Sequence, residues 1–163
     1  ISVNIGANDV KLLDTLGQCY VAICTETQIS EMFDKRSAKF TKDIKTVLKK
    51  LTVSAGNKPR VYLMGYYSLF SNSNVNCSDV EGIDQSERIV GSQVVAELNS
   101  ALEEAAKKND NVTYVDVSFN GKELCQPGSY VQGLKANRPF HPTTKGHEVY
   151  ASALIKAMDK KEK

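Results

Sequence analysis

The segment on which the fold prediction rests, residues 138–151, reads RPFHPTTKGHEVYA and contains both histidines of the chain. His141 stands directly before a proline, and such a residue is restricted to extended backbone, which predicts a rigid turn. Thr143 or Thr144 then suits the N-cap of a helix, and apolar residues recur at helical spacing over residues 149–158. We therefore expect a loop that presents His141 just ahead of a C-terminal helix, a kind of position at which functional residues concentrate.

The two histidines have different expected roles. His147 falls within the first turns of the predicted helix, where a histidine is more often a capping or packing residue than a catalyst. For His141, the alternative to a catalytic role is that of a surface histidine in a proline-bounded turn. This segment alone favours neither role for His141, and the choice between them depends on the N-terminal part of the chain.

Length and charge favour one soluble globular domain over residues 1–163. The chain carries 21 basic and 19 acidic residues, which nearly cancel. Lysines and acidic residues alternate along the predicted helix at residues 29–53, a pattern typical of a solvated face, so nothing favours nucleic-acid binding. No apolar run approaches the ~18 residues that a membrane span requires, and no signal peptide opens the sequence.

The four cysteines permit three disulfide connectivities. Cys19 and Cys24 could close a small loop after the first helix, whereas Cys77 and Cys125 both lie in polar loops that follow predicted strands. We predict these two pairs, because the other connectivities would tie the early loop to distant strand ends. Two histidines and scattered cysteines make a poor zinc site, so we expect no metal. Disulfides indicate an oxidising compartment, and we expect a secreted protein.

Strand and helix signals alternate along the chain. Short apolar runs bounded by turn residues predict strands at residues 1–5, 60–66 and 111–117. Apolar residues at helical spacing predict helices at residues 10–16, 29–53, 85–109 and from Thr143 onward. This alternation is typical of a three-layer α/β/α sandwich with a mostly parallel sheet. Three strands would leave sheet edges uncovered, so we expect one or two further strands ahead of Ile1.

A polar turn, Gly6-Ala7-Asn8-Asp9, follows the first predicted strand. In an open parallel sheet such turns lie at the carboxyl ends of the strands, where ligands bind. The alternative is a plain helix cap, because Asn and Asp both suit that position. Two long polar loops, residues 67–84 and 118–140, are further candidates for the walls of a site.

This turn and the late segment from Phe140 to His147 together resemble the third and fifth sequence blocks of the SGNH (GDSL) hydrolase superfamily. Between them, the strand at residues 61–66, the strand at residues 114–117 and the two cysteine-bearing loops look like the secreted, disulfide-containing lipase and esterase branch. The resemblance covers nearly the whole chain. It implies an SGNH-type, flavodoxin-like α/β sandwich.

The resemblance also implies an activity, the hydrolysis of a small-molecule, lipid or carbohydrate ester without a cofactor. In this chemistry a serine attacks the ester carbonyl, a histidine takes the serine proton, and an oxyanion hole holds the developing charge. The matching positions assign His141 as the base and Asn8 as the oxyanion-hole side chain. Gly6 would let the backbone pass close to the substrate.

The sequence departs from the family pattern in two respects. It contains neither the Gly-Asp-Ser nucleophile block nor the second glycine block, and we expect both in a segment upstream of Ile1 that the active enzyme needs. Arg138 stands three residues before His141, where the family's acid is usual, and a guanidinium cannot accept the imidazole N–H. Some members use a main-chain carbonyl instead, which residues 136–138 could supply. Asp116 is a second candidate, for which a structural cap or turn is the alternative.

Two other classes of protein fit parts of this pattern. A catalytically dead SGNH-fold domain would keep the pocket and act as a binding or interaction module. A flavodoxin-like binding protein gains little support, because no glycine-rich phosphate loop is present. A natural chain with an upstream Gly-Asp-Ser block would favour the enzyme.

Overall fold

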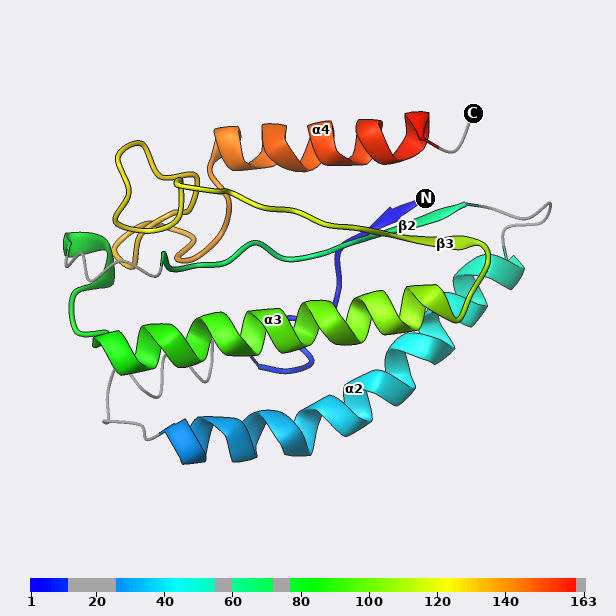
Figure 1. Cartoon of the computed structure of the whole chain (residues 1–163), viewed down its shortest axis with the longest axis horizontal. Helices are drawn as coiled ribbons and strands as arrows, with labels where there is room; N and C mark the ends of the chain where they lie inside the picture. Colours follow the sequence, from blue (N-terminus) through cyan, green and yellow to red (C-terminus); the bar gives the residue numbers. More distant parts are fainter. Residues whose placement is uncertain (12–25, 55–59, 72–76, 161–163) are drawn as a thin grey trace.

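The computed structural model of the chain describes residues 1–11, 26–54, 60–71 and 77–160. Within these ranges three parallel strands form one sheet in the order β1, β2, β3. The elements are β1 (Ser2–Val3), α2 (Glu26–Ser54), β2 (Val61–Met64), the 3₁₀ helix η1 (Ser78–Val80), α3 (Gln85–Lys107), β3 (Val112–Val115) and α4 (Thr144–Asp159). Helices α2 and α3 lie on one face of the sheet and α4 on the other (Figure 1). The predicted three-layer α/β/α arrangement with a parallel sheet is confirmed.

Strand β2 lies at the centre of the sheet and is buried on both faces. Val61 and Leu63 are 0 % exposed, and Tyr62 and Met64 are 6 % and 5 % exposed. Successive side chains of a strand point to opposite faces, so helices on both sides of the sheet are needed to bury all four. The uninterrupted apolar character of this run is the expected signature of such a strand.

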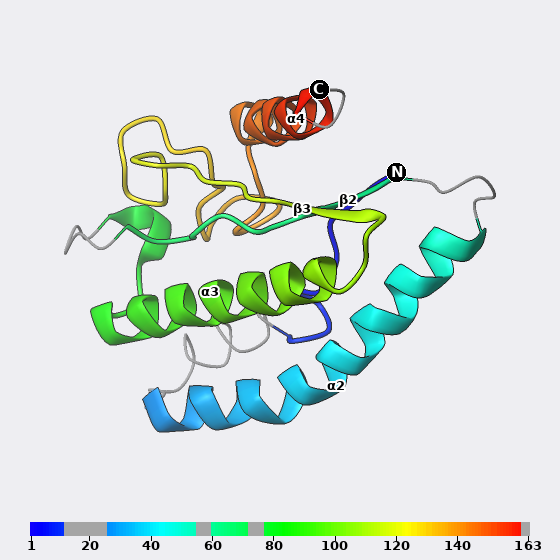
Figure 2. The same ribbon diagram turned by 45° about the vertical axis from the view of Figure 1, so that its right-hand side comes forward.

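The helices predicted at residues 29–53, 85–109 and after Thr143 are confirmed as α2, α3 and α4. Helix α3 begins at a capping box, in which the Asp84 carboxylate accepts the backbone N–H of Glu87 at 2.9 Å and the Glu87 carboxylate accepts that of Asp84 at 2.8 Å. Thr143 is the N-cap of α4, since its hydroxyl oxygen accepts the N–H of Gly146. Helix α2 curves along the outside of α3 (Figure 2).

The N-terminal strand is shorter than predicted, since β1 covers Ser2–Val3 at the edge of the sheet. The chain then forms turns as far as Lys11, so the helix predicted at residues 10–16 lies mostly outside the described residues. The predicted pair Cys19 and Cys24 also lies outside them.

The predicted Cys77–Cys125 disulfide is confirmed, with the two Cα atoms 5.5 Å apart. It joins two segments, residues 77–84 before α3 and residues 118–140 between β3 and α4, which we call the linked loops. Their backbones are also joined directly, because the N–H of Leu134 donates to the carbonyl of Asp79 at 3.0 Å. The side chains of Lys135 and Glu81 form an ion pair across the same junction. The two loops are therefore joined by a covalent bond, a backbone hydrogen bond and an ion pair.

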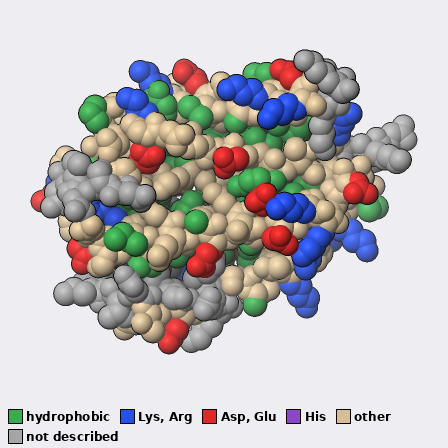
Figure 3. Space-filling view, in the orientation of Figure 1, with side chains coloured by type: hydrophobic (Ala, Val, Ile, Leu, Met, Phe, Trp, Pro, Cys, Tyr) green, Lys and Arg blue, Asp and Glu red, His purple; other side chains and the backbone are tan. Residues whose placement is uncertain are grey.

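Positive and negative side chains are interspersed over the face shown in Figure 3. At the C-terminal end of α3, Lys107 pairs with Glu103, and the C-cap residue Lys108 pairs with Glu104. None of the helices in the described ranges is both long enough and apolar enough to cross a membrane.

Candidate active site

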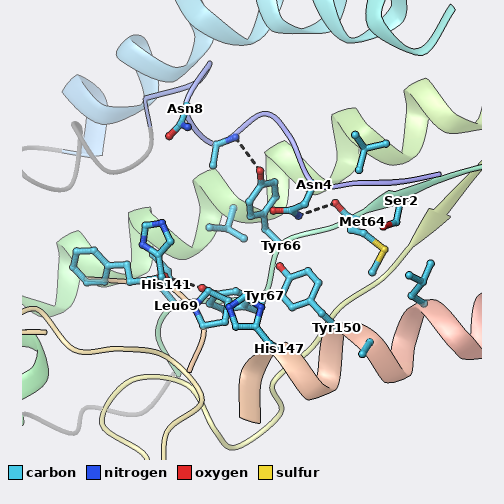
Figure 4. Close-up of a pocket in the computed structure, with 17 residues that line it drawn as sticks. Ser2, Asn4, Asn8, Met64, Tyr66, Tyr67, Leu69, His141, His147 and Tyr150 are labelled. Carbon is cyan, nitrogen blue, oxygen red and sulfur yellow. Dashed lines mark hydrogen bonds between the residues drawn. The ribbon is translucent and has the colours of Figure 1, made fainter. Parts of the chain in front are cut away.

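A pocket of about 460 Å³ lies beside β1, between the turn that follows this strand and the start of α4. Its lining includes Asn8 from the turn, Tyr67 from the segment after β2, His141 from the loop before α4, and His147 and Tyr150 from α4 itself. Figure 4 shows these side chains around one cavity. The structure thus brings Asn8 and His141, which are far apart in the sequence, to the same pocket.

The backbone of the Asn8 turn depends on a glycine. Gly6 has φ +121°, outside the range that residues with a side chain adopt readily. A Cβ atom at this position would also stand 2.8 Å from Cζ of Phe40, so both the backbone and the packing require glycine. Gly6 does not line the pocket. Its tight turn, closed by the hydrogen bond from the Val10 N–H to the Gly6 carbonyl at 3.0 Å, presents Asn8 to it.

Gly6→Ala is therefore expected to lower the free energy of unfolding by about 3 kcal/mol, from backbone strain plus a clash. Gly121→Ala is the matched control, because Gly121 also has a positive φ of +73° but nothing lies within 4 Å of its added Cβ. Backbone strain alone should cost the control about 1 kcal/mol. Equal losses of the two variants in denaturant melts would contradict the close contact with Phe40.

The imidazole of His141 is held by a main-chain carbonyl. Its Nδ1 lies 2.9 Å from the carbonyl oxygen of Pro139. A carbonyl can only accept, so this contact is a hydrogen bond when Nδ1 carries a proton, and in that neutral tautomer the lone pair stands at Nε2. The sequence predicts a carbonyl from residues 136–138, and the structure shows that of Pro139. This one-residue difference arises because the backbone turns at Phe140, which has φ +63°, and brings the Pro139 carbonyl to Nδ1.

The backbone on both sides of His141 is tied to the second linked loop through Gln132. The Gln132 carbonyl accepts the N–H of Phe140 at 2.9 Å, and the Gln132 N–H donates to the carbonyl of His141 at 2.8 Å. The Gln132 side chain adds a bond to the carbonyl of Pro142 at 3.0 Å. The backbone of His141 is therefore held in place by hydrogen bonds, although its side chain is exposed.

His147 differs in part from its expected placement, whereas Asp116 lies away from His141. His147 is exposed and lines the same pocket as His141, so it is not a packing residue of the core. Asp116 is exposed and lines a different pocket, between α3, β3 and α4, together with Lys145. The structure gives no support to Asp116 as a partner of His141.

Polar groups along the pocket wall hold backbone carbonyls near the end of β2. The Tyr150 hydroxyl donates to the carbonyl of Gly65 at 3.0 Å, and the Asn4 amide donates to the same oxygen at 3.3 Å. The Tyr66 hydroxyl accepts the N–H of Ala7, which ties the Asn8 turn to this wall. Burial raises the pKa of Tyr66 and Tyr150, so both phenols stay protonated around neutral pH.

Ser2 is a hydroxyl side chain among the pocket-lining residues, and it lies on β1, away from His141 (Figure 4). No group of three or more histidine, cysteine or carboxylate side chains in the described part of the chain could hold a metal ion. The pocket-lining side chains include the imidazoles of His141 and His147, which can exchange a proton, and the Asn8 amide, which can donate a hydrogen bond.

The sequence model of the GDSL-like lipase/acylhydrolase family matches residues 1–149, a span that includes both the Asn8 turn and His141. The chain belongs to this family. GDSL-like family membership supports a hydrolase of the esterase and lipase type. No curated protein sequence matches this GDSL-like chain.

Solved structures show that this GDSL-like chain shares its fold with bacterial lipases. Phospholipase A1 from Streptomyces albidoflavus NA297 is 21 % identical, with a TM-score of 0.80 over 95 % of this chain and 67 % of that one. The extracellular lipase from Streptomyces rimosus is 22 % identical, with a TM-score of 0.66 over 93 % of this chain and 68 % of that one. At such low sequence identities, these two comparisons show that the fold is shared and do not extend to function.

Proposed function

We propose that this chain supplies the base and an oxyanion-hole donor of a serine carboxylic-ester hydrolase, whose nucleophile comes from a segment outside the 163 residues. The observation that carries the proposal is the His141 geometry. Nδ1–H donates to the Pro139 carbonyl, which leaves Nε2 as a proton acceptor in the pocket that Asn8 also lines. We treat residues 1–163 as one domain, the C-terminal portion of this enzyme.

In the proposed reaction, a serine Oγ attacks the ester carbonyl carbon while His141 Nε2 takes the serine proton. The carbonyl oxygen becomes an oxyanion, which accepts an N–H of Asn8. The tetrahedral intermediate then expels the alcohol, which receives the proton from the imidazolium. Water attacks the acyl-enzyme by the same route, releasing the acid and the free serine. The Pro139 carbonyl keeps the ring in the required tautomer throughout.

The position of the sheet edge supports an external nucleophile. Strand β1 is the edge strand of the described sheet, and its residues Ser2 and Val3 line the pocket. A parallel strand added beside β1 would end at the same sheet edge as the Asn8 turn and the His141 loop, where the nucleophile is needed. Ser2 is a poor candidate for this role because of its place away from His141.

The apolar part of the lining suits the acyl group of the substrate. Leu69, Val95 and Leu154 contribute to this part. A small-molecule, lipid or carbohydrate ester satisfies these requirements, and one of the structural neighbours is a phospholipase. Secretion is part of the proposal, because the Cys77–Cys125 disulfide requires an oxidising compartment.

Labelling with a fluorophosphonate tests this proposal, because such probes modify a serine only when a base and an oxyanion hole activate it. The natural-length protein should gain one covalent adduct, on a serine outside residues 1–163, and should hydrolyse a p-nitrophenyl ester. Residues 1–163 alone should do neither. Robust turnover by the isolated chain would contradict an external nucleophile. Absence of both label and turnover in the natural-length protein would favour a catalytically dead binding module.

Asn8→Ala is expected to lower kcat by about 10²- to 10³-fold in the natural-length protein, the usual effect of losing an oxyanion-hole donor. KM should change little, because the bond forms to the oxyanion and not to the ground-state ester. Asp9→Ala is the matched control, since Asp9 is the next residue of the turn and does not line the pocket. Equal kcat values for the two variants would remove Asn8 from the oxyanion hole.

A further inference from the structure

Both polar atoms of the peptide that joins Phe140 to His141 are hydrogen-bonded. The Tyr67 hydroxyl donates to the Phe140 carbonyl oxygen at 2.7 Å, and the His141 N–H donates to the Arg138 carbonyl at 3.2 Å. A peptide unit is planar, so fixing its carbonyl and its N–H fixes the orientation of the whole plane. The direction in which the His141 side chain leaves the backbone follows from this plane.

This peptide needs external support because Phe140 is in the left-handed region, with φ +63°. That conformation is uncommon for a residue with a bulky side chain, and it persists only where surrounding contacts over-determine it. Three contacts do this for Phe140. The Tyr67 hydroxyl donates to its carbonyl, its N–H donates to the Gln132 carbonyl, and its ring packs edge-on against that of Phe70 with centroids 6.3 Å apart.

The orientation of this peptide also determines the contact that holds the imidazole. Pro139 and His141 are two residues apart, with Phe140 between them, so the distance from Nδ1 to the Pro139 carbonyl depends on the backbone torsions of Phe140. A carbonyl is a neutral acceptor and gives a weaker bond than a carboxylate, whose charge roughly doubles the strength of a hydrogen bond. Rigid backbone geometry therefore has to supply the orientation that a triad acid would otherwise supply.

Tyr67 is well placed to hold this geometry because its own ring is fixed. It is 6 % exposed, stacks on Phe119 with centroids 4.0 Å apart, and meets Tyr150 edge-on at 6.0 Å. Burial raises the pKa of the Tyr67 phenol, so the hydroxyl keeps its proton and remains a donor.

We propose that Tyr67 is a positioning residue for His141, whose hydroxyl holds the Phe140–His141 peptide in the orientation that brings Nδ1–H to the Pro139 carbonyl and leaves Nε2 facing the substrate. The proposal rests on the proposed function for its effect on turnover. The effect on the imidazole itself does not depend on catalysis.

Tyr67→Phe in the natural-length protein tests this role, because phenylalanine keeps the stacked ring and removes only the hydroxyl. We expect kcat to fall about ten- to a hundredfold, the scale of a small misplacement of a catalytic group, with KM nearly unchanged. Nitrogen NMR of the two histidines should show His141 as the single Nδ1–H tautomer in the native protein and as a mixture of tautomers in the variant. His147→Ala assigns the signals. Native kcat together with a native His141 spectrum would overturn the proposal.

Two further variants separate positioning from general stability. Tyr130→Phe removes the hydroxyl from another ring that meets Phe119 edge-on, outside the pocket lining, and should leave both kcat and the His141 signals unchanged. Tyr150→Phe removes a hydroxyl from the Gly65 carbonyl, away from the His141 loop, and should lower Tm about as much as Tyr67→Phe without mixing the His141 tautomers. A tautomer mixture in Tyr150→Phe would attribute the effect to general loosening and overturn the specific role of Tyr67.

The NMR measurement needs no turnover. If the natural-length protein hydrolyses no ester, the proposed function fails while the tautomer comparison still decides whether Tyr67 orients His141. If hydrolysis occurs and Tyr67→Phe changes neither kcat nor the spectrum, the positioning role fails while the hydrolase assignment stands.

Discussion

Replacing His141 by alanine in the natural-length protein is expected to lower kcat by about 10⁴- to 10⁶-fold, because the members of a nucleophilic relay act as one unit. Without the imidazole, the attacking serine would remain a neutral hydroxyl and a weak nucleophile. The leaving alcohol would also lose its proton donor. The measurement is kcat for ester hydrolysis, with the fold of the variant checked by circular dichroism. His141 is exposed, so its removal should cost little stability.

Two comparison variants locate the effect. His147→Ala alters an exposed side chain of the same pocket, and we expect changes in stability and KM that are small beside the loss in kcat for His141→Ala. Asp116→Asn should leave most activity intact, since the Pro139 carbonyl already accepts the imidazole N–H. A folded His141→Ala protein with near-normal kcat would end the assignment of this residue as the base. A crippled Asp116→Asn protein would identify Asp116 as the triad acid.

Removing the Cys77–Cys125 disulfide is expected to lower the free energy of unfolding by about 4 kcal/mol, the chain-entropy value for a closure of this length. The two cysteines are 48 residues apart in the sequence. For a chain of this size, the loss corresponds to a fall in Tm of about 8 to 16 °C. The double variant Cys77→Ser/Cys125→Ser measures it in urea melts. Substitution is preferable to a reductant, because a reductant would also act on any other disulfide in the chain.

The same variant should lose activity beyond its loss of stability, because one of the linked loops carries Gln132, which pins the backbone around His141. Ser118→Ala is a suitable control, since Ser118 lies in the same loop, is exposed, and hydrogen-bonds locally with Asn120. If the free energy of unfolding of the double cysteine variant lies within about 1 kcal/mol of the native value, the remaining contacts between the linked loops are enough to hold them together.

Much of the layered fold could be predicted from the spacing of apolar residues, because that spacing reflects which face of each element is buried. The apolar spacing in α2 and α3, and the uninterrupted apolar run of β2, reflect elements pressed against a core, and Leu63, Leu98 and Leu102 are 0 % exposed. The extent of β1 was less predictable. The alternation over residues 1–5 suggests a longer strand, but pairing ends after Val3, where the chain turns toward Gly6.

The candidate site could be predicted only where a motif marks it. Asn8 and His141 stand in recognisable segments, and the structure brings both to one pocket. The Pro139 carbonyl and the left-handed Phe140 could not be located, because they result from hydrogen bonds to Tyr67 and Gln132, which are distant in the sequence. Tyr67 carries no local pattern that separates it from the neighbouring tyrosines of its segment. Its role follows from the atom that its hydroxyl meets.

The linked loops, residues 77–84 and 118–140, can be exchanged between homologues only as a pair. A chimaera that received one of them from a protein without the matching cysteine would present an unmatched thiol, and its new loop would have to restore the backbone hydrogen bond between the Leu134 and Asp79 positions. Replacing residues 118–140 would also remove Gln132, which holds the backbone around His141. Loop grafting should therefore transplant both segments together, or vary only side chains outside the junction between them.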